Sequence, residues 1–199
     1  MQVFPHLTVV CGLGILPFRH VFNIDAIRWS LAAHNICFTN SVHSWFFARG
    51  KCIPVIRGAG VYQKAMDFSI QQLNRGQWVH IFPEGKVNED NQFIRFKWGV
   101  GRLVAESVHM PIIIPLWHVG MDRVLPNVQP YRFRMGNQVV FNIGKPIDVK
   151  EVIQKARSMK ADEVTLRKMI TDKIQAEMMA LKRETEKLYS ELNPSWSTV

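Results

Sequence analysis

The stretch that most constrains the fold is a strand-like run that ends at a proline, within residues 76–86. Residues 78–82, with the sequence Trp-Val-His-Ile-Phe, predict a strand. Pro83 ends it, because proline cannot donate to a central ladder, and Gly85 allows the backbone to approach a ligand. The strand therefore delivers Glu84 to its carboxyl end, where α/β sheets usually bind ligands. Taken alone, the same turn is more typical of an ordinary strand end with a solvated Glu, because turns favour Pro and Gly in any case.

A second strand and a helix precede this run. Residues 51–58 predict a strand that ends at Arg57, and residues 61–74 carry apolar side chains at helical spacing. The order strand, helix, strand is that of a βαβ crossover, which pairs its strands in parallel. We therefore expect Arg57 and Glu84 at the same edge of a sheet. A guanidinium beside a carboxylate can hold a phosphate and an adjacent hydroxyl.

The rest of the chain predicts an α/β fold with a central, mostly parallel sheet flanked by helices. In chain order the pattern predicts a helix over 23–33, a strand over 35–39, and a helix over 41–49; then a helix over 93–107, a strand over 111–119, a strand over 138–144, and helices from 148 onward. We expect an α/β domain over 1–147 and a C-terminal helical tail over 148–199 packed on the same domain.

Composition limits the classes of partner. The 199 residues are 47% hydrophobic, enough for one domain with a full core, and the formal net charge is +9. This charge favours an anionic partner, either nucleic acid, an anionic lipid surface or a phosphorylated substrate. The basic residues are spread along the chain, with no signature of a nucleic-acid-reading module, so we expect no nucleic acid partner. The 3 cysteines have neither zinc-site nor disulfide-framework spacing, and we expect no metal.

The longest apolar stretches are residues 7–18 and 110–121, both shorter than the roughly 20 residues that span a bilayer. Residues 1–6 also lack the basic region of a secretory signal. Any contact with a membrane is therefore expected to be peripheral. Residues 110–121 suit an interfacial segment, and we expect anionic lipid to attract the excess Lys and Arg. A core strand explains the same segment equally well. The expected membrane-contacting residues are Ile112, Ile113, Ile114, Leu116 and Trp117.

The motifs occur in the order found in a known enzyme family. Arg57 at one strand end, the Phe-Pro-Glu-Gly turn at 82–85 and the proline-bounded strand at 111–115 resemble the later three blocks of the glycerolipid acyltransferases. The similarity extends to one branch of that family, the tafazzins. It covers roughly residues 19–146 and is carried by 50–55, 60–64, 78–88, 95–99 and 115–121.

The resemblance implies a glycerolipid acyltransferase-like fold and a peripheral transacylase of the mitochondrial outer or inner membrane. Such an enzyme moves acyl chains between phospholipids and lysophospholipids, above all monolysocardiolipin, and requires neither coenzyme A nor another cofactor. The residues that match the family's substrate-binding blocks are Arg57, Phe82, Pro83, Glu84 and Gly85. By resemblance, Arg57 and Glu84 bind the phosphate and glycerol parts of the substrate.

The family's chemistry resides in a His-x-x-x-x-Asp block. The imidazole takes the proton of the attacking lysolipid hydroxyl, and the Asp orients and stabilises the imidazolium. The candidate catalytic pair is His20 and Asp25, which have this spacing. In tafazzins the block precedes the segment that resembles 19–23, so we expect a chance match and a shortened form with little or no activity. The alternative is a catalytically inactive lipid-binding or assembly protein on the same scaffold.

Overall fold

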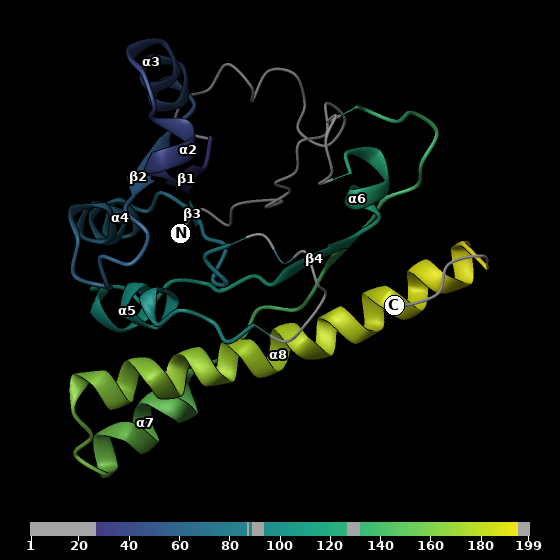
Figure 1. Ribbon diagram of the computed structural model, residues 1–199. Coiled ribbons are helices and arrows are strands. Elements are labelled where there is room, and N and C mark those ends of the chain that lie inside the picture. Colours follow the sequence, from purple (N-terminus) through teal and green to yellow (C-terminus); the bar gives the residue numbers. More distant parts are fainter. Residues whose placement is uncertain (1–26, 87, 89–93, 127–131, 195–199) are drawn as a thin grey trace. The chain divides into compact units, whose positions relative to one another are not determined.

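The structure is a computed structural model that describes residues 27–86, 88, 94–126 and 132–194. The described residues fall into two compact units. The first comprises those within Met1–Gly85 and Lys97–Pro111, and the second those within Lys86–Phe96 and Ile112–Val199. Figure 1 labels the elements along the chain. In the first unit they are β1 (Trp29–Ala33), α2 (His34–Cys37), α3 (Ser41–Arg49), β2 (Cys52–Val55), α4 (Lys64–Asn74), β3 (Val79–His80) and α5 (Gly99–Glu106).

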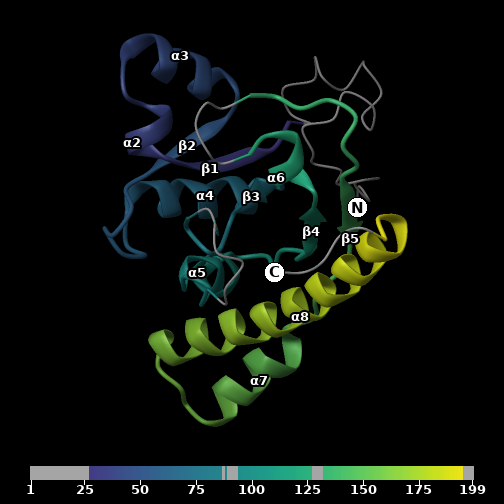
Figure 2. The same ribbon diagram turned by 45° about the vertical axis from the view of Figure 1, so that its right-hand side comes forward.

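The first unit is built on a three-stranded sheet with the order β2-β1-β3. Both outer strands run parallel to β1, with Leu31 opposite Ile53 in β2 and Ser30 opposite His80 in β3. Figure 2 shows the three strands side by side. The predicted parallel sheet is therefore confirmed. The crossover from β2 through α4 to β3, however, does not join neighbours, because β1 lies between them.

The central strand was not expected. The sequence predicts a helix over 23–33, yet residues 29–33 are extended, and the strand predicted over 35–39 is replaced by the short helix α2. All five residues of β1 are half-buried, so no alternation of apolar and polar side chains marks the strand. A short run without alternation cannot be told from a helix by its periodicity. Pairing with a strand on each side stabilises the extended form.

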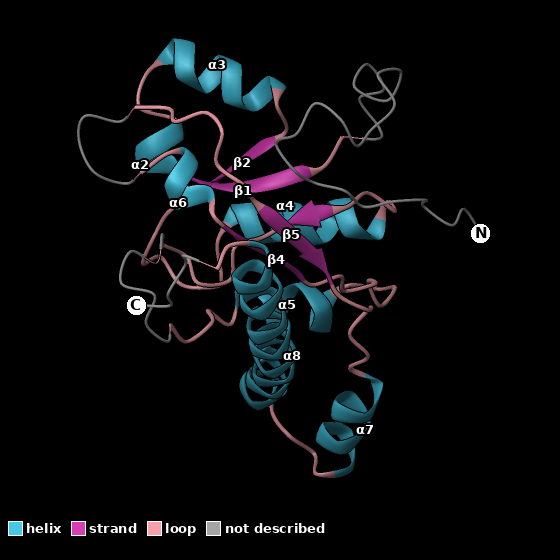
Figure 3. Ribbon diagram, turned by 90° about the vertical axis from the view of Figure 1, so that its right-hand side faces the viewer, coloured by secondary structure: helices cyan, strands magenta, loops and turns pink. Residues whose placement is uncertain are grey.

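Helices α4 and α5 complete the core of this unit. Helix α4 contacts β2, β3 and α5, and Figure 3 shows it beside the sheet. The buried side chains include Ile53, Ala65, Met66, Val100 and Leu103. The helix predicted over 93–107 is shorter in the structure, where α5 begins at Gly99. A Cβ at Gly99 would lie 3.2 Å from Met66 Cε, so close packing accounts for this glycine.

The second unit pairs a two-stranded antiparallel sheet with a long helix. Its elements are β4 (Leu116–Val119), α6 (Met121–Val124), β5 (Val140–Ile143), α7 (Lys150–Ser158) and α8 (Glu163–Leu192). Helix α8 packs on β4, β5 and α7 (Figure 1). Its buried side chains include Ile170, Ile174, Leu181 and Tyr189, at turn-by-turn spacing. The predicted helical tail is thus present as α7 and α8.

Candidate functional site

The candidate site lies where β2 and β3 end. Strand β2 leads into a loop over 56–63 that carries Arg57, and β3 is followed by the turn over 82–85 that carries Glu84. Since both strands run parallel to β1, both connections leave the same edge of the sheet. This is the edge where ligands bind in α/β sheets. The intervening strand β1 separates the two connections.

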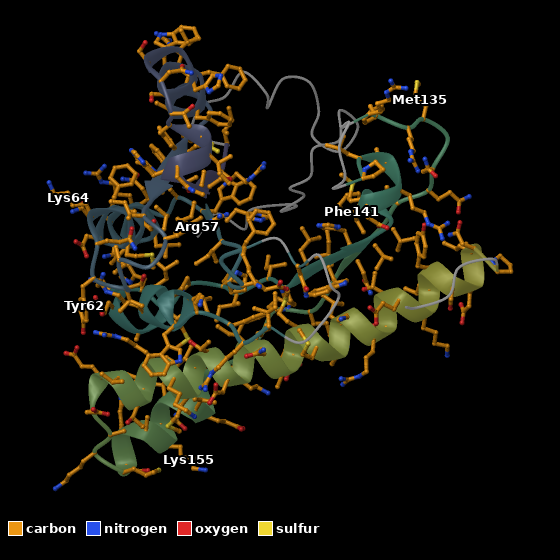
Figure 4. The ribbon with its side chains drawn as sticks, viewed as in Figure 1. Arg57, Tyr62, Lys64, Met135, Phe141 and Lys155 are labelled. Atoms are coloured by element: carbon orange, nitrogen blue, oxygen red, sulfur yellow. The ribbon has the colours of Figure 1, made fainter. Side chains whose placement is uncertain are left out.

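The loop over 56–63 is closed by one side chain. The Gln63 amide oxygen accepts from the Ile56 backbone N–H at 3.0 Å. Its amide nitrogen donates to the carbonyl oxygens of Gly60, at 2.7 Å, and Ile56, at 3.4 Å. Gly58 and Gly60 have φ of 85° and 78°, which glycine adopts readily. Arg57 is exposed, and Figure 4 labels it together with Tyr62 and Lys64 from the connection and the start of α4.

A buried arginine holds the same loop from helix α5. Arg102 is only 6% exposed, and its Nη1 donates to the Val61 carbonyl oxygen at 2.7 Å. Its Nη2 donates to Asp67 Oδ1 at 2.7 Å, and its Nε donates to both carboxylate oxygens of Glu106. Its guanidinium also lies 4.9 Å from the centre of the Tyr62 ring. The loop is therefore fixed by Gln63 at its ends and by Arg102 near its last residues.

The turn over 82–85 is fastened at two points. The Gly85 N–H donates to the Phe82 carbonyl oxygen at 3.1 Å, which closes the turn around Pro83. The Pro83 carbonyl oxygen accepts from the Lys97 N–H at 2.7 Å. Gly85 has φ of 71°, a conformation that side chains with a Cβ rarely adopt. Glu84 is half-buried in this turn.

The side chains around this turn are aromatic. Phe82 is 63% exposed, and its ring centre lies 4.6 Å from that of His80. Such a contact keeps an apolar ring at the rim of the sheet while leaving most of it accessible. An exposed phenyl group next to a carboxylate suits an amphipathic ligand better than a fully polar one.

The five expected membrane-contacting residues lie in the second unit, where their side chains differ in exposure. Ile112 is 78% exposed, whereas Ile113, Ile114, Leu116 and Trp117 are half-buried. Ile113 forms an antiparallel bridge with Ile147, and the Lys182 ammonium lies 5.7 Å from the centre of the Trp117 ring. Membrane contact by these residues stays a prediction. None of the helices in the described ranges is long and apolar enough to cross a bilayer.

The candidate catalytic pair, His20 and Asp25, lies outside the described residues. Within the described residues, no group of three or more His, Cys, Asp or Glu side chains could hold a metal ion. Sequence reasoning missed Gln63 and Arg102, the two side chains that fix the Arg57 loop. No spacing rule marks either, because each bonds to backbone groups that only the folded chain brings within reach.

Comparison with known proteins identifies the family. A model of the family described as Acyltransferase matches residues 13–119. The chain is 53% identical over 180 residues to a protein named tafazzin from Drosophila melanogaster, covering 90% of this chain and 48% of that protein. It is 45% identical over 112 residues to an N-acylphosphatidylethanolamine synthase from Arabidopsis thaliana, covering 55% of this chain and 39% of that protein.

A relative in Dictyostelium discoideum named taffazin is 42% identical over 146 residues, covering 71% of this chain and 51% of that protein. The chain thus spans about half the length of the curated relatives that carry this name. Its fold is similar to the crystal structure of the 1-acyl-sn-glycerophosphate acyltransferase PlsC from Thermotoga maritima. The TM-score is 0.56 at 20% identity, covering 86% of this chain and 59% of that one. The chain therefore belongs to the acyltransferase family, and tafazzins are among its relatives.

Proposed function

We propose that this chain transfers acyl groups between phospholipids and lysophospholipids without coenzyme A, and that it remodels cardiolipin on a mitochondrial membrane surface. The observation that carries the proposal is the shared sheet edge, from which the Arg57 loop and the Glu84 turn both leave. Relatives that carry the name tafazzin support it, as does the lipid named for the plant relative. The outer and inner mitochondrial membranes are the proposed locations.

In this proposal the sheet edge holds the lysolipid. The Arg57 guanidinium binds a phosphate through its planar fork, and the Glu84 carboxylate accepts from a glycerol hydroxyl. Phe82, Pro83 and Gly85 shape the turn that presents Glu84. The side chain of Phe82, being mostly exposed, contacts the apolar part of the lipid.

The chemistry is a transesterification. The lysolipid hydroxyl oxygen bonds to the acyl carbonyl carbon of a donor phospholipid, and the donor's ester C–O bond breaks. A general base takes the hydroxyl proton and returns it to the departing oxygen, so that no proton is gained or lost. The candidate base is His20, oriented by Asp25, but we expect this spacing to be a chance match, so transfer by this chain is expected to be weak or absent. The proposal requires no metal or cofactor.

The test of activity uses labelled phosphatidylcholine as donor and monolysocardiolipin as acceptor. We expect Arg57→Ala and Glu84→Gln to reduce acyl transfer by about tenfold or more, since each removes a charged group from the bound substrate. Arg75→Ala is the matched control, because Arg75 is an exposed arginine that follows α4 in the same unit. Equal transfer by wild type and both site variants would overturn the assigned roles.

The same assay separates the enzyme from its alternative. Turnover that is abolished by His20→Ala assigns the base. Lipid binding without any turnover in the wild-type chain supports a catalytically inactive lipid-binding or assembly protein on this scaffold. If the wild-type chain neither binds lipid nor turns it over, both proposed functions are wrong.

Membrane association is tested by flotation with vesicles that contain or lack cardiolipin. We expect Ile112→Asp to reduce flotation, because it adds a negative charge to an exposed apolar side chain of the proposed interfacial segment. Val108→Asp is the matched control, since Val108 is equally exposed at 78% and lies outside the proposed contact. Equal flotation of the two variants would contradict contact through this segment.

A further inference from the structure

The side chain of Gln63 turns away from the helix that it precedes. Gln63 is the N-cap of α4, with the extended backbone usual for that position. Its side chain does not cap the helix and instead makes three hydrogen bonds back into the loop. The side-chain hydrogen bonds of Gln63 therefore stabilise the loop over 56–63 and not the first turn of α4.

The three hydrogen bonds define the path of the backbone around Arg57. One side-chain amide pairs with both the N–H and the carbonyl oxygen of Ile56, the residue immediately before Arg57. The third bond reaches Gly60, three residues after Arg57. The segment that carries Arg57 is therefore held on both sides by a single side chain.

At this point the described residues add one hydrogen bond to those of Gln63, a 3.3 Å turn bond from the Ala59 N–H to the Ile56 carbonyl oxygen. Gly58 and Gly60 are flexible positions, and a Cβ at either would meet no atom within 4 Å. The glycines thus supply conformational freedom rather than room for packing. Residues 56–60 are exposed as well. Without the amide bonds, the segment around Arg57 would keep only that long turn bond among its described hydrogen bonds, so binding a ligand would have to restrict its motion first.

We propose that Gln63 is a positioning residue, which holds Arg57 in the orientation that binds the phosphate of a lysophospholipid at the sheet edge. This inference rests on the proposed role of Arg57 in substrate binding. Both polar atoms of the amide are needed, since the oxygen accepts one hydrogen bond and the nitrogen donates two. A glutamate at this position accepts from Ile56 but cannot donate to the two carbonyl oxygens, and an asparagine is one methylene shorter.

The test measures binding of the full chain to phosphatidylcholine vesicles that carry monolysocardiolipin. Vesicles in which phosphatidylserine supplies the same charge report attraction that is not specific to the lysolipid. We expect Gln63→Ala and Gln63→Glu to weaken the lysolipid-specific binding about tenfold, because a misplaced binding group loses most of its contribution. Gln71→Ala is the matched control, since Gln71 is an exposed glutamine within α4, the helix that Gln63 precedes.

A double variant distinguishes positioning from a general structural role. If Gln63 acts through Arg57, Gln63→Ala has no further effect on binding in a chain that already carries Arg57→Ala. A variant that merely loosens the fold would weaken both backgrounds equally. Additive losses in the double variant would therefore overturn the inference, as would wild-type binding by Gln63→Ala.

Amide hydrogen exchange provides a readout independent of lipid. We expect exchange at the Ile56 N–H to rise in Gln63→Ala, because its acceptor is removed, while the Ile53 N–H within β2 keeps its protection. Unchanged exchange at the Ile56 N–H would show that the Gln63 side chain does not protect it, and would overturn the inference. Faster exchange at the Ile56 N–H in Gln63→Ala, together with unchanged lipid binding by Arg57→Ala, would have a different meaning. The Gln63 hydrogen bonds would then hold the loop, but Arg57 would not bind the substrate, and both its proposed role and the positioning by Gln63 would be wrong.

Discussion

Arg102 Nη1 donates a 2.7 Å hydrogen bond to the carbonyl oxygen of Val61, and so ties helix α5 to the loop that carries Arg57. The guanidinium is buried and also binds the carboxylates of Asp67 and Glu106. Each of its three nitrogens donates to a carboxylate or a carbonyl oxygen, which is the condition under which a buried charge is tolerated. The loop is thus anchored to the core of its unit.

Replacing Arg102 by methionine should reduce the free energy of unfolding by about 2–3 kcal/mol, because it leaves the Val61 carbonyl and two carboxylates without their donor. Urea unfolding measures the change. Arg95→Met is the matched control, since Arg95 is 54% exposed and lies 3.5 Å from Asp172, and it should cost less than about 1 kcal/mol. Similar losses in both variants would show that burial of Arg102 does not matter.

Gly85→Ala should reduce the free energy of unfolding by about 1–2 kcal/mol through backbone strain alone. A Cβ at Gly85 would meet the Lys97 side chain at 3.4 Å, an ordinary contact, but φ at this position is 71°. Gly50→Ala is the control, because Gly50 has φ of −79° and its nearest contact would be 3.5 Å. Thermal unfolding compares the two. If Gly85→Ala is as stable as wild type, the turn tolerates a different backbone path.

Gly120 and Gly136 separate strain from steric clash in the second unit. Both have positive φ, 98° and 82°, but a Cβ at Gly120 would lie 2.4 Å from the Gln138 carbonyl oxygen, whereas one at Gly136 would meet nothing. We expect Gly136→Ala to cost about 1 kcal/mol and Gly120→Ala about 3 kcal/mol or more. Denaturant titration tests this order, and equal costs would refute the clash.

Acid should weaken the fold partly through His118. Partial burial of the ring lowers the pKa of His118, and Asp122 raises it in part. The unfolded chain, with the ordinary pKa of about 6.5, then binds the proton more readily, so stability is lost as the pH falls through that value to the lowered folded pKa. The melting temperature of His118→Gln should fall less than that of wild type between pH 7.5 and pH 5. Parallel falls would contradict the assignment.

Much of the site was predictable because its signals are local. Pro83 and Gly85 mark a strand end by backbone chemistry alone, and the helical spacing over 61–74 predicted a crossover that the structure contains as α4. The direction of β2 and β3 follows from that crossover. The catalytic pair His20 and Asp25 stays a prediction, since it lies outside the described residues.

The sequence by itself therefore determined which segments end in Arg57 and Glu84, and that both ends face one sheet edge. Only the tertiary structure decided that β1 lies between those strands. All five residues of β1 are half-buried, so no alternation of buried and exposed side chains predicts a strand there. Tertiary structure also decided which side chains hold the Arg57 loop. Gln63 and Arg102 bind backbone carbonyls, and the positions of carbonyls depend on the path of the folded chain rather than on any residue type.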